Sequence, residues 1–294
     1  MHSHNHTNYN KAFIIGITLN VIYILVEVFY GLLINSMALL ADAGHNFSDV
    51  LGLLFAWGAA YLAKTATTER RTYGLRKSTI LAAFFNAILL MIAVGAITIE
   101  AIRKLILPEP VQGTVMIIVA GVGVVINAVT AFLFMRGRKK DLNIKAAFLH
   151  MAVDAGVSLG VVFAGLLITF TNWLWIDPAI SLLIVLVITL GTWSLLKDSF
   201  HLSMDAVPKG IDLKEVGNYL KSIKGVKEVH DLHVWAMSTT ETALTAHLVI
   251  PDETKDDNFL KIICGELHSK FGIEHSTIQI EKSAQSANCE HHNV

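Results

Sequence analysis

The stretch Ser36–Ala63, SMALLADAGHNFSDVLGLLFAWGAAYLA, decides how the rest of the chain is organised. It is long and apolar enough to cross a bilayer as a helix, which takes about 20 residues. It also carries Asp42, His45 and Asp49. An ionisable side chain in the hydrocarbon core costs about 2.5–3.5 kcal/mol, so such side chains face the interior of a helix bundle and usually have a function. The stretch therefore predicts a transmembrane helix that carries functional polar groups.

A second pair of residues repeats the spacing of His45 and Asp49. The apolar segment AAFLHMAVDAGVSLGVV contains His150 and Asp154, which are also four residues apart. Side chains at this spacing lie on one face of a helix, one turn from each other. Two neutral imidazoles and two carboxylates make a four-coordinate nitrogen and oxygen site of the kind that Zn²⁺ takes. The alternative is that each pair only hydrogen-bonds within its helix and stabilises the bundle.

The composition excludes an ordinary soluble protein. The 294 residues have a mean hydropathy of +0.55 and only 16% charged side chains, which indicates an integral membrane protein. Both cysteines, Cys264 and Cys289, lie in the polar C-terminal third. This pattern gives no disulfide framework and is typical of a reducing cytosol.

Six apolar runs occur along the chain, and the charges between them predict the topology. The breaks after the second and the fourth run are rich in Lys and Arg, whereas the other breaks are short or poor in both. Basic short loops stay in the cytoplasm, so both termini are expected on that side. The runs are 12–34, 37–63, 79–102, 114–135, 146–170 and 178–196. The basic residues are Lys64, Arg70, Arg71, Arg76, Lys77, Arg136, Arg138, Lys139, Lys140 and Lys145.

The C-terminal third has the pattern of a small α+β domain. Its helical and alternating segments follow one another in the order helix, strand, strand, helix, strand. By topology this domain is cytoplasmic. The segments are 211–223, 226–237, 242–250, 259–271 and 277–281. The predicted divisions are a His-containing cytoplasmic tail at 1–11, a six-helix transmembrane domain at 12–198, the α+β domain at 199–283 and a Cys/His tail at 284–294.

Other polar residues at membrane depth have two interpretations each. Asp42 shares a helix face with His45, so it either orients that imidazole or is a polar residue at the outer mouth. Asp177, followed by Pro178, is interpreted as the N-cap of the sixth span rather than as a ligand. Glu27 is undecided. Close helix approach is expected at Gly121, Gly123, Gly156 and Gly160.

The chemistry of the four His and Asp side chains predicts an antiporter. Zinc needs neutral imidazole and ionised carboxylate, so metal ions and protons compete for the same atoms. Histidine exchanges its proton near physiological pH. A site that binds either ion and faces each side in turn exchanges one for the other. The H-E-x-x-H motif is absent, and no acid–base residue accompanies the four side chains, so an enzyme such as a metal-dependent hydrolase is not expected.

The two H-x-x-x-D motifs, the six apolar runs and the segment VHDLHVW at 229–235 resemble the cation diffusion facilitator family. The resemblance covers nearly the whole chain. It implies that His45, Asp49, His150 and Asp154 are the transport-site ligands, and a histidine at the first position resembles the zinc-preferring branch. It also implies Zn²⁺/H⁺ exchange out of the cytosol, a homodimer and a ferredoxin-like, metallochaperone-type cytoplasmic domain.

Further metal ligands are expected outside the membrane. By the resemblance, His230, His247 and Glu281 match positions that bind regulatory zinc in the cytoplasmic domain, and His233 and His275 are further candidates. The alternative for these side chains is a set of surface histidines without bound metal. The tails offer weaker candidates: His2, His4, His6, Cys289, His291 and His292.

The sequence thus predicts a multi-pass protein of the cytoplasmic membrane that exports zinc by Zn²⁺/H⁺ antiport. Its expected partners are the membrane, divalent metal ions and a second copy of the chain, with no nucleic acid. The alternative is a membrane-anchored zinc sensor that does not transport, in which the helices only anchor a zinc-binding domain.

Overall fold

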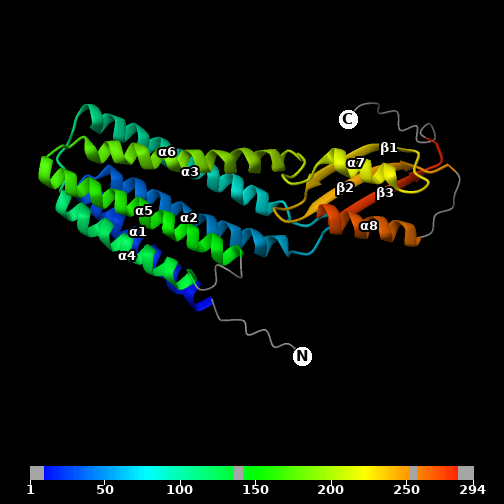
Figure 1. Ribbon diagram of the computed structural model, residues 1–294, viewed down its shortest axis with the longest axis horizontal. Helices are drawn as coiled ribbons and strands as arrows, with labels where there is room; N and C mark the ends of the chain where they lie inside the picture. Colours follow the sequence, from blue (N-terminus) through cyan, green and yellow to red (C-terminus); the bar gives the residue numbers. More distant parts are fainter. Residues whose placement is uncertain (1–9, 136–141, 252–256, 284–294) are drawn as a thin grey trace. The chain divides into compact units, whose positions relative to one another are not determined.

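The computed structural model describes residues 10–135, 142–251 and 257–283. Six long helices of 23 to 30 residues precede a small sheet (Figure 1). The tail candidates His2, His4, His6, Cys289, His291 and His292 lie outside the described residues. The helices are α1 (Asn10–Leu33), α2 (Met37–Ala63), α3 (Ser78–Ile106), α4 (Gly113–Met135), α5 (Leu142–Thr171) and α6 (Ile176–Ser203).

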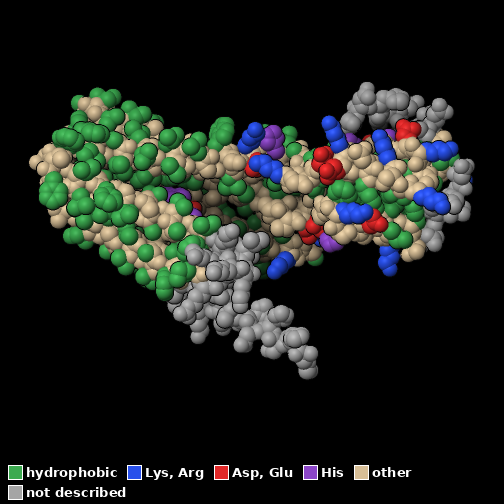
Figure 2. All heavy atoms as spheres, viewed as in Figure 1, with side chains coloured by type: hydrophobic (Ala, Val, Ile, Leu, Met, Phe, Trp, Pro, Cys, Tyr) green, Lys and Arg blue, Asp and Glu red, His purple; other side chains and the backbone are tan. Residues whose placement is uncertain are grey.

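Four helices within the described residues are long and apolar enough to cross a membrane: α3, α4, α5 and α6. This is fewer than the six spans expected from the sequence. Helix α1 contributes a shorter apolar segment, Thr18–Leu33, and the polar Asp42, His45 and Asp49 lower the hydropathy of α2. Large hydrophobic side chains cover the outside of these helices, as Figure 2 shows. Such an apolar surface is what a bilayer requires.

The chain divides into two compact units. The bundle unit is formed by Met1–Leu54 with Phe85–Leu195, and the sheet unit by Phe55–Phe84 with Leu196–Val294. The end of α2, the loop after it and the start of α3 therefore group with the C-terminal domain.

The core of the bundle unit is built from small and branched side chains. Buried alanines and aliphatic residues of α2, α4, α5 and α6 form one cluster, and small residues let helices approach closely. Helices α4 and α5 approach each other closely where a Cβ on Gly113 would lie 2.6 Å from the carbonyl oxygen of Gly165. Of the glycines expected at close contacts, Gly123 faces Tyr23. Gly121, Gly156 and Gly160 have open space around them in the described part of the chain.

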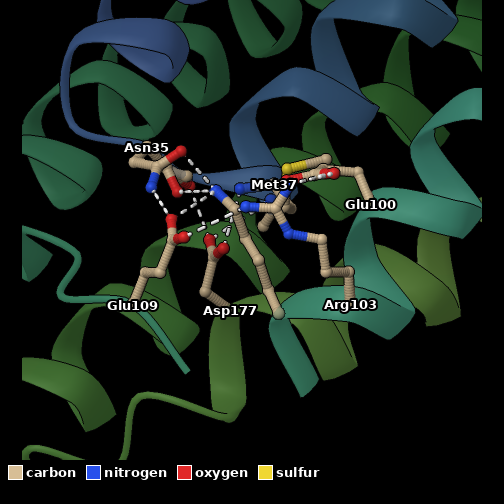
Figure 3. A network of polar contacts seen from close by, with 9 residues as sticks. Asn35, Met37, Glu100, Arg103, Glu109 and Asp177 are labelled. Carbon is tan, nitrogen blue, oxygen red and sulfur yellow. Dashed lines mark hydrogen bonds and ion pairs between the residues drawn. The ribbon is translucent and has the colours of Figure 1, made fainter. Parts of the chain in front are cut away.

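A buried carboxylate holds the first turn of α2 at the connection end of the bundle, where α1 joins α2, α3 joins α4 and α5 joins α6 (Figure 3). Asp177 is fully buried. It accepts hydrogen bonds from Ser36 Oγ at 2.5 Å and from the backbone N–H groups of Met37 at 2.7 Å and Ala38 at 3.2 Å. The sequence predicted an N-cap of α6, but Asp177 lies inside the first turn of α6 and caps α2 instead.

A lysine completes this network. Lys104 is buried, and its Nζ donates to the carbonyl oxygen of Asn35 at 2.8 Å and to the Asn35 side chain. Asn35 has a φ of 60°, a left-handed backbone that asparagine tolerates, and its amide also donates to Glu109. Glu109 in turn pairs with Arg103 at 3.4 Å. Polar contacts therefore link α2, α3, α6 and the connections between helices at this end of the bundle.

We expect Asp177→Ala to destabilise the bundle by about 2–4 kcal/mol, because it removes a cap and leaves buried donors unpaired. The check is the thermal unfolding midpoint of the protein in detergent. The control is Asp205→Asn, which breaks an exposed ion pair with Lys77 at 2.6 Å, suits the left-handed backbone there (φ 58°) and should cost little. Equal midpoints for the two variants would show that the Asp177 contacts do not stabilise the fold.

The C-terminal part of the sheet unit contains a three-stranded sheet and two helices, in the order that the sequence predicts. Strands β1 and β2 are antiparallel, and β2 and β3 are parallel. Asp212 caps the first helix by accepting from the backbone N–H of Lys214. The elements are α7 (Leu213–Ser222), β1 (Glu228–Ala236), β2 (Thr242–Val249), α8 (Asp257–Phe271) and β3 (His275–Glu281).

Both helices of this domain share one core with one face of the sheet. Val216 and Leu220 of α7 and Ile263 and Leu267 of α8 join a buried cluster. The members of this cluster from the strands are Val234, Leu244, Ala246 and Leu248. Because side chains alternate along a strand, His247 lies on the opposite face. That face is free to carry a site.

The loop between α2 and α3 contacts this domain within the sheet unit. Arg76 Nη1 pairs with Glu241 Oε2 at 2.9 Å, and Thr79 Oγ1 accepts from the backbone N–H of Thr239 at 3.0 Å. Two of the basic residues that predicted the topology, Arg76 and Lys77, are thus paired with acidic partners. The start of α3 is held to the sheet by these contacts.

Candidate metal centre

The two H-x-x-x-D pairs of the sequence meet inside the bundle unit. His45 and Asp49 project from α2, and His150 and Asp154 project from α5. Each pair spans one helical turn, so its two side chains share a face. We call these four side chains the quartet. Asp154 is the most buried, with 1% of its side chain exposed, and His150 is the most open, at 43%.

The distances within the quartet fit a tetrahedral ion. His45 Nε2 lies 3.4 Å from Asp154 Oδ1 and 3.8 Å from Asp49 Oδ2. His150 Nε2 lies 3.3 Å from Asp49 Oδ2 and 3.6 Å from Asp154 Oδ2. Ligand atoms around zinc, with bonds of about 2.0–2.1 Å, are about 3.3–3.4 Å apart in a tetrahedron. The two imidazoles face different oxygens of Asp154, so a rotation of that carboxylate, with small changes in the distances, would bring four ligand atoms around one ion.

Three members of the quartet are assembled more tightly than the fourth. The ligand atoms of His45, Asp49 and Asp154 all lie within 4.8 Å of one another. His150 contacts both aspartates, but its ring centroid is 6.2 Å from that of His45. His150 thus lies at the open edge of the cluster.

Several atoms of the quartet lack the partners that buried polar atoms require. Asp49 Oδ2 and Asp154 Oδ1 are buried without a hydrogen-bond donor among the described residues, and His45 Nδ1 also lacks a partner there. Unpaired buried polar atoms are costly. A cation between the carboxylates would satisfy the two carboxylate oxygens, so the residues present fit a divalent metal ion as substrate.

Asp42 does not hold the His45 imidazole. Its carboxylate accepts a hydrogen bond from Ser158 Oγ of α5 at 2.8 Å, and it is fully buried. The hydrogen bond to the His45 imidazole that the sequence suggested is therefore not formed.

A second cluster lies on the open face of the sheet. His230 of β1 is directly opposite His247 of β2, and Glu281 ends β3. Glu281 Oε1 is 2.8 Å from His247 Nδ1, and Glu281 Oε2 is 3.3 Å from His230 Nε2. The ligand atoms of the three residues all lie within 4.8 Å of one another. Two imidazoles and a carboxylate are a donor set that zinc accepts.

The sequence analysis missed Asp231, which adjoins this cluster. Asp231 lies at a bulge in β1 between His230 and His233 and has a φ of 52°, in the left-handed region. Its carboxylate is 3.4 Å from His247 Nε2 and 3.0 Å from His233 Nε2. Strained backbone often occurs at functional sites. The motif H-D-x-H at 230–233 is the sequence signal that could have indicated Asp231.

His275 is not brought into the cluster. It begins β3 opposite Ala243, whereas Glu281 at the other end of the strand is opposite Val249. Its ring makes an edge contact with Tyr73 at 5.7 Å between centroids. His233 reaches the cluster only through Asp231.

These two sites and the apolar helices define a multi-pass membrane protein with clusters of metal-ligand side chains in both units. Residues 13–202 match the family described as cation efflux transmembrane domain. Residues 208–283 match the family ZT_dimer, described as cation efflux protein, cytoplasmic domain. The chain belongs to the cation efflux family.

Several curated proteins are similar over nearly the whole chain. The "Cadmium, cobalt and zinc/H(+)-K(+) antiporter" of Bacillus subtilis (strain 168) is 34% identical, with 97% of this chain and 93% of the relative covered. The "Metal cation efflux system protein CzcD" of Cupriavidus metallidurans is 36% identical, with 95% and 89% covered. The "Zinc transporter ZitB" of Escherichia coli (strain K12) is 37% identical, with 95% and 92% covered.

Proposed function

We propose that the chain exports zinc from the cytosol in exchange for protons, and that it alternates access around the quartet. The observation that carries this proposal is the set of four distances, 3.3 to 3.8 Å, between the imidazoles and carboxylates of α2 and α5. The relatives named as a zinc transporter and as a cadmium, cobalt and zinc antiporter support zinc as the substrate.

The donor set explains why the exchange is with protons. Zinc binds neutral imidazole and ionised carboxylate, so every bound proton must leave before the metal ion enters. The pKa of a free histidine side chain is about 6.5, so its neutral and protonated forms both occur at physiological pH. When the site opens to the other side, protons displace the metal ion and return with the empty carrier.

The placement of ligands on two helices supports alternating access. His45 and Asp49 move with α2, and His150 and Asp154 move with α5. A change in the packing of these helices alters both distances that join them, from His45 to Asp154 and from His150 to Asp49. We propose six spans, including α1 and α2, with both termini in the cytosol and the protein in the cytoplasmic membrane. The basic residues of the short loops support this topology.

The cluster of His230, His247 and Glu281 is proposed as a regulatory zinc site. Its side chains are contributed by all three strands, so a bound ion would link them. A homodimer is part of this proposal, supported by the match to the ZT_dimer family. Cytosolic zinc on the sheet would then favour one arrangement of the two copies.

The zinc sensor without transport is the weaker alternative. A sensor needs only the cluster on the sheet, and it gives no reason for two carboxylates and two imidazoles within the apolar bundle. Ionisable groups there cost about 2.5–3.5 kcal/mol each.

Zinc flux into proteoliposomes tests the proposal. With an acidic interior, we expect zinc to accumulate inside against its own gradient, because outward proton flow drives inward zinc flow. Zinc addition without an imposed gradient should acidify the outside. Accumulation should weaken as the pH on the zinc-loading side falls through the histidine range, since protons compete for the ligands.

A protonophore provides the control. Zinc accumulation that persists after the proton gradient is collapsed would contradict proton exchange. A folded preparation that binds zinc but does not move it would contradict transport and favour the sensor.

A further inference from the structure

A second polar cluster lies beside the quartet in the bundle unit. Glu27 of α1, Asp42 of α2 and Ser158 of α5 are each 0% exposed, and Tyr23 of α1 is 1% exposed. Tyr23 Oη donates to Glu27 Oε1 at 2.8 Å, and Ser158 Oγ donates to Asp42 Oδ2 at 2.8 Å. No ion pair of Glu27 or Asp42 with a Lys or Arg occurs in the described ranges. Two carboxyl groups are thus buried without a Lys or Arg partner in this part of the structure.

Each carboxyl group also has a buried oxygen that accepts no hydrogen bond, although the side-chain amide of Asn46 on α2 lies near Glu27. These oxygens are Glu27 Oε2 and Asp42 Oδ1, both buried and without a hydrogen-bond partner among the described residues. The two side chains are nevertheless within hydrogen-bonding reach of each other. Two adjacent carboxylates cannot both be ionised at low cost in an apolar interior. A single proton between them would remove one charge and supply the missing donor.

We propose that Glu27 and Asp42 form a proton-binding site, distinct from the quartet, in which the two carboxyl groups share one proton. The carboxyl and hydroxyl oxygens include no imidazole or thiolate, so they suit a proton or a hard cation better than zinc. Shared protons of this kind occur in paired buried aspartates elsewhere.

The position of the pair gives it a role in the exchange. Asp42 lies three residues before His45 on α2, and Ser158 lies four residues after Asp154 on α5. The pair is therefore about one helical turn from the quartet, toward the connection end. In the proposed topology this is the side from which protons enter. The proposal that the pair carries the returning proton rests on the proposed exchange of zinc for protons. The proposal that the pair binds a proton does not depend on it.

The groups around Glu27 and Asp42 determine how tightly the pair binds its proton. The titratable groups that face the pair are Tyr23 on the same helix, Asp42 on α2, and then His45 and Asp154, whose charges act on Asp42. Helix α4 presents Gly123 at this level, where a Cβ would lie 2.1 Å from Tyr23 Oη. The missing side chain at Gly123 leaves room for the tyrosine hydroxyl that donates to Glu27.

Infrared spectroscopy of the full-length protein in lipid tests for the proton directly. A protonated carboxyl group has a C=O band that a carboxylate lacks. We expect this band at neutral pH in the wild type, and its loss in Glu27→Gln. In Tyr23→Phe it should persist to higher pH, because a donated hydrogen bond stabilises the ionised form. The matched control is Glu100→Gln, which changes a part-exposed carboxylate paired with Arg103 and should leave the band unchanged.

The role in exchange is tested by counting protons per zinc in proteoliposomes. Glu27→Gln should still bind zinc at the quartet, measured by calorimetry, but should return about one proton fewer per zinc ion, since a coupled pair loses its proton as a unit. Glu100→Gln should keep the wild-type ratio.

Each negative result has its own meaning. Absence of the carboxyl band from the wild type at neutral pH would overturn the proton site. If the band is absent and zinc exchange depends on K⁺ or Na⁺, a metal cation occupies the site instead. A band that Glu27→Gln removes while the proton ratio stays at the wild-type value would overturn the role in exchange. If the wild type itself moves no protons in exchange for zinc, the proposed function is wrong, but the infrared evidence for the bound proton is unaffected.

Discussion

Asp154→Asn should lower zinc transport by at least about 100-fold, which corresponds to about 2.7 kcal/mol in binding of the transported ion. Asp154 is the buried member of the quartet, at 1% exposure, and its two oxygens face His45 at 3.4 Å and His150 at 3.6 Å. Asparagine keeps the volume and one carbonyl oxygen but removes the negative charge. Removing a residue that only hydrogen-bonds to a metal ligand lowers metal affinity by about 10–100-fold. Removing a ligand itself should therefore lower it by at least the upper value.

The measurement is initial zinc uptake into proteoliposomes at a fixed pH gradient. Asp198→Asn is the matched control, since that carboxylate pairs with Lys209 at 2.5 Å and belongs to neither metal cluster. Its uptake should equal the wild-type value. Wild-type uptake by Asp154→Asn would show that the quartet is a structural set of hydrogen bonds and not the transport site.

Glu281→Ala should lower the zinc affinity of the site on the sheet by at least about 100-fold. The carboxylate of Glu281 is 4% exposed and connects the two imidazoles, with Oε1 2.8 Å from His247 and Oε2 3.3 Å from His230. Without it, two neutral imidazoles on neighbouring strands have no anionic ligand to complete the set. Activation of transport by cytosolic zinc should be lost with the binding.

Calorimetry on the full chain measures this affinity, in an Asp154→Asn background so that the quartet does not contribute. Glu228→Ala is the control, because Glu228 is an exposed residue of β1 in neither metal cluster. It should bind zinc as the parent does. If Glu281→Ala binds zinc equally well, other residues hold the ion and the proposed regulatory site is wrong.

The local pattern of the sequence accounts for much of the candidate site. The spacing of four places His45 with Asp49, and His150 with Asp154, because an α-helix has about 3.6 residues per turn. The burial cost of these groups in an apolar segment indicated that the two pairs meet. Which atoms face each other could not be predicted, since this depends on the rotation and depth of α2 against α5.

Long-range contacts changed two interpretations. Asp177 was assigned to the start of its own helix because capping is usually local, but it caps α2, whose first residues are 140 positions away. The glycines at a close contact of α4 and α5 are Gly113 and Gly165 rather than Gly121 and Gly156. The rotation of a helix about its axis decides which of its glycines contacts a neighbouring helix. This rotation cannot be predicted from the sequence of that helix alone.

The sequence by itself determined the apolar helices, the helix and strand order of the C-terminal domain and the residue types that bind metal. These depend on hydropathy, period and donor chemistry, which are properties of neighbouring residues. The tertiary structure alone decided that Glu27 and Asp42 meet beside the quartet and that Asp231 joins His247. The physical reason is that these contacts join residues from different helices or strands, and only the packing of those elements brings the atoms together.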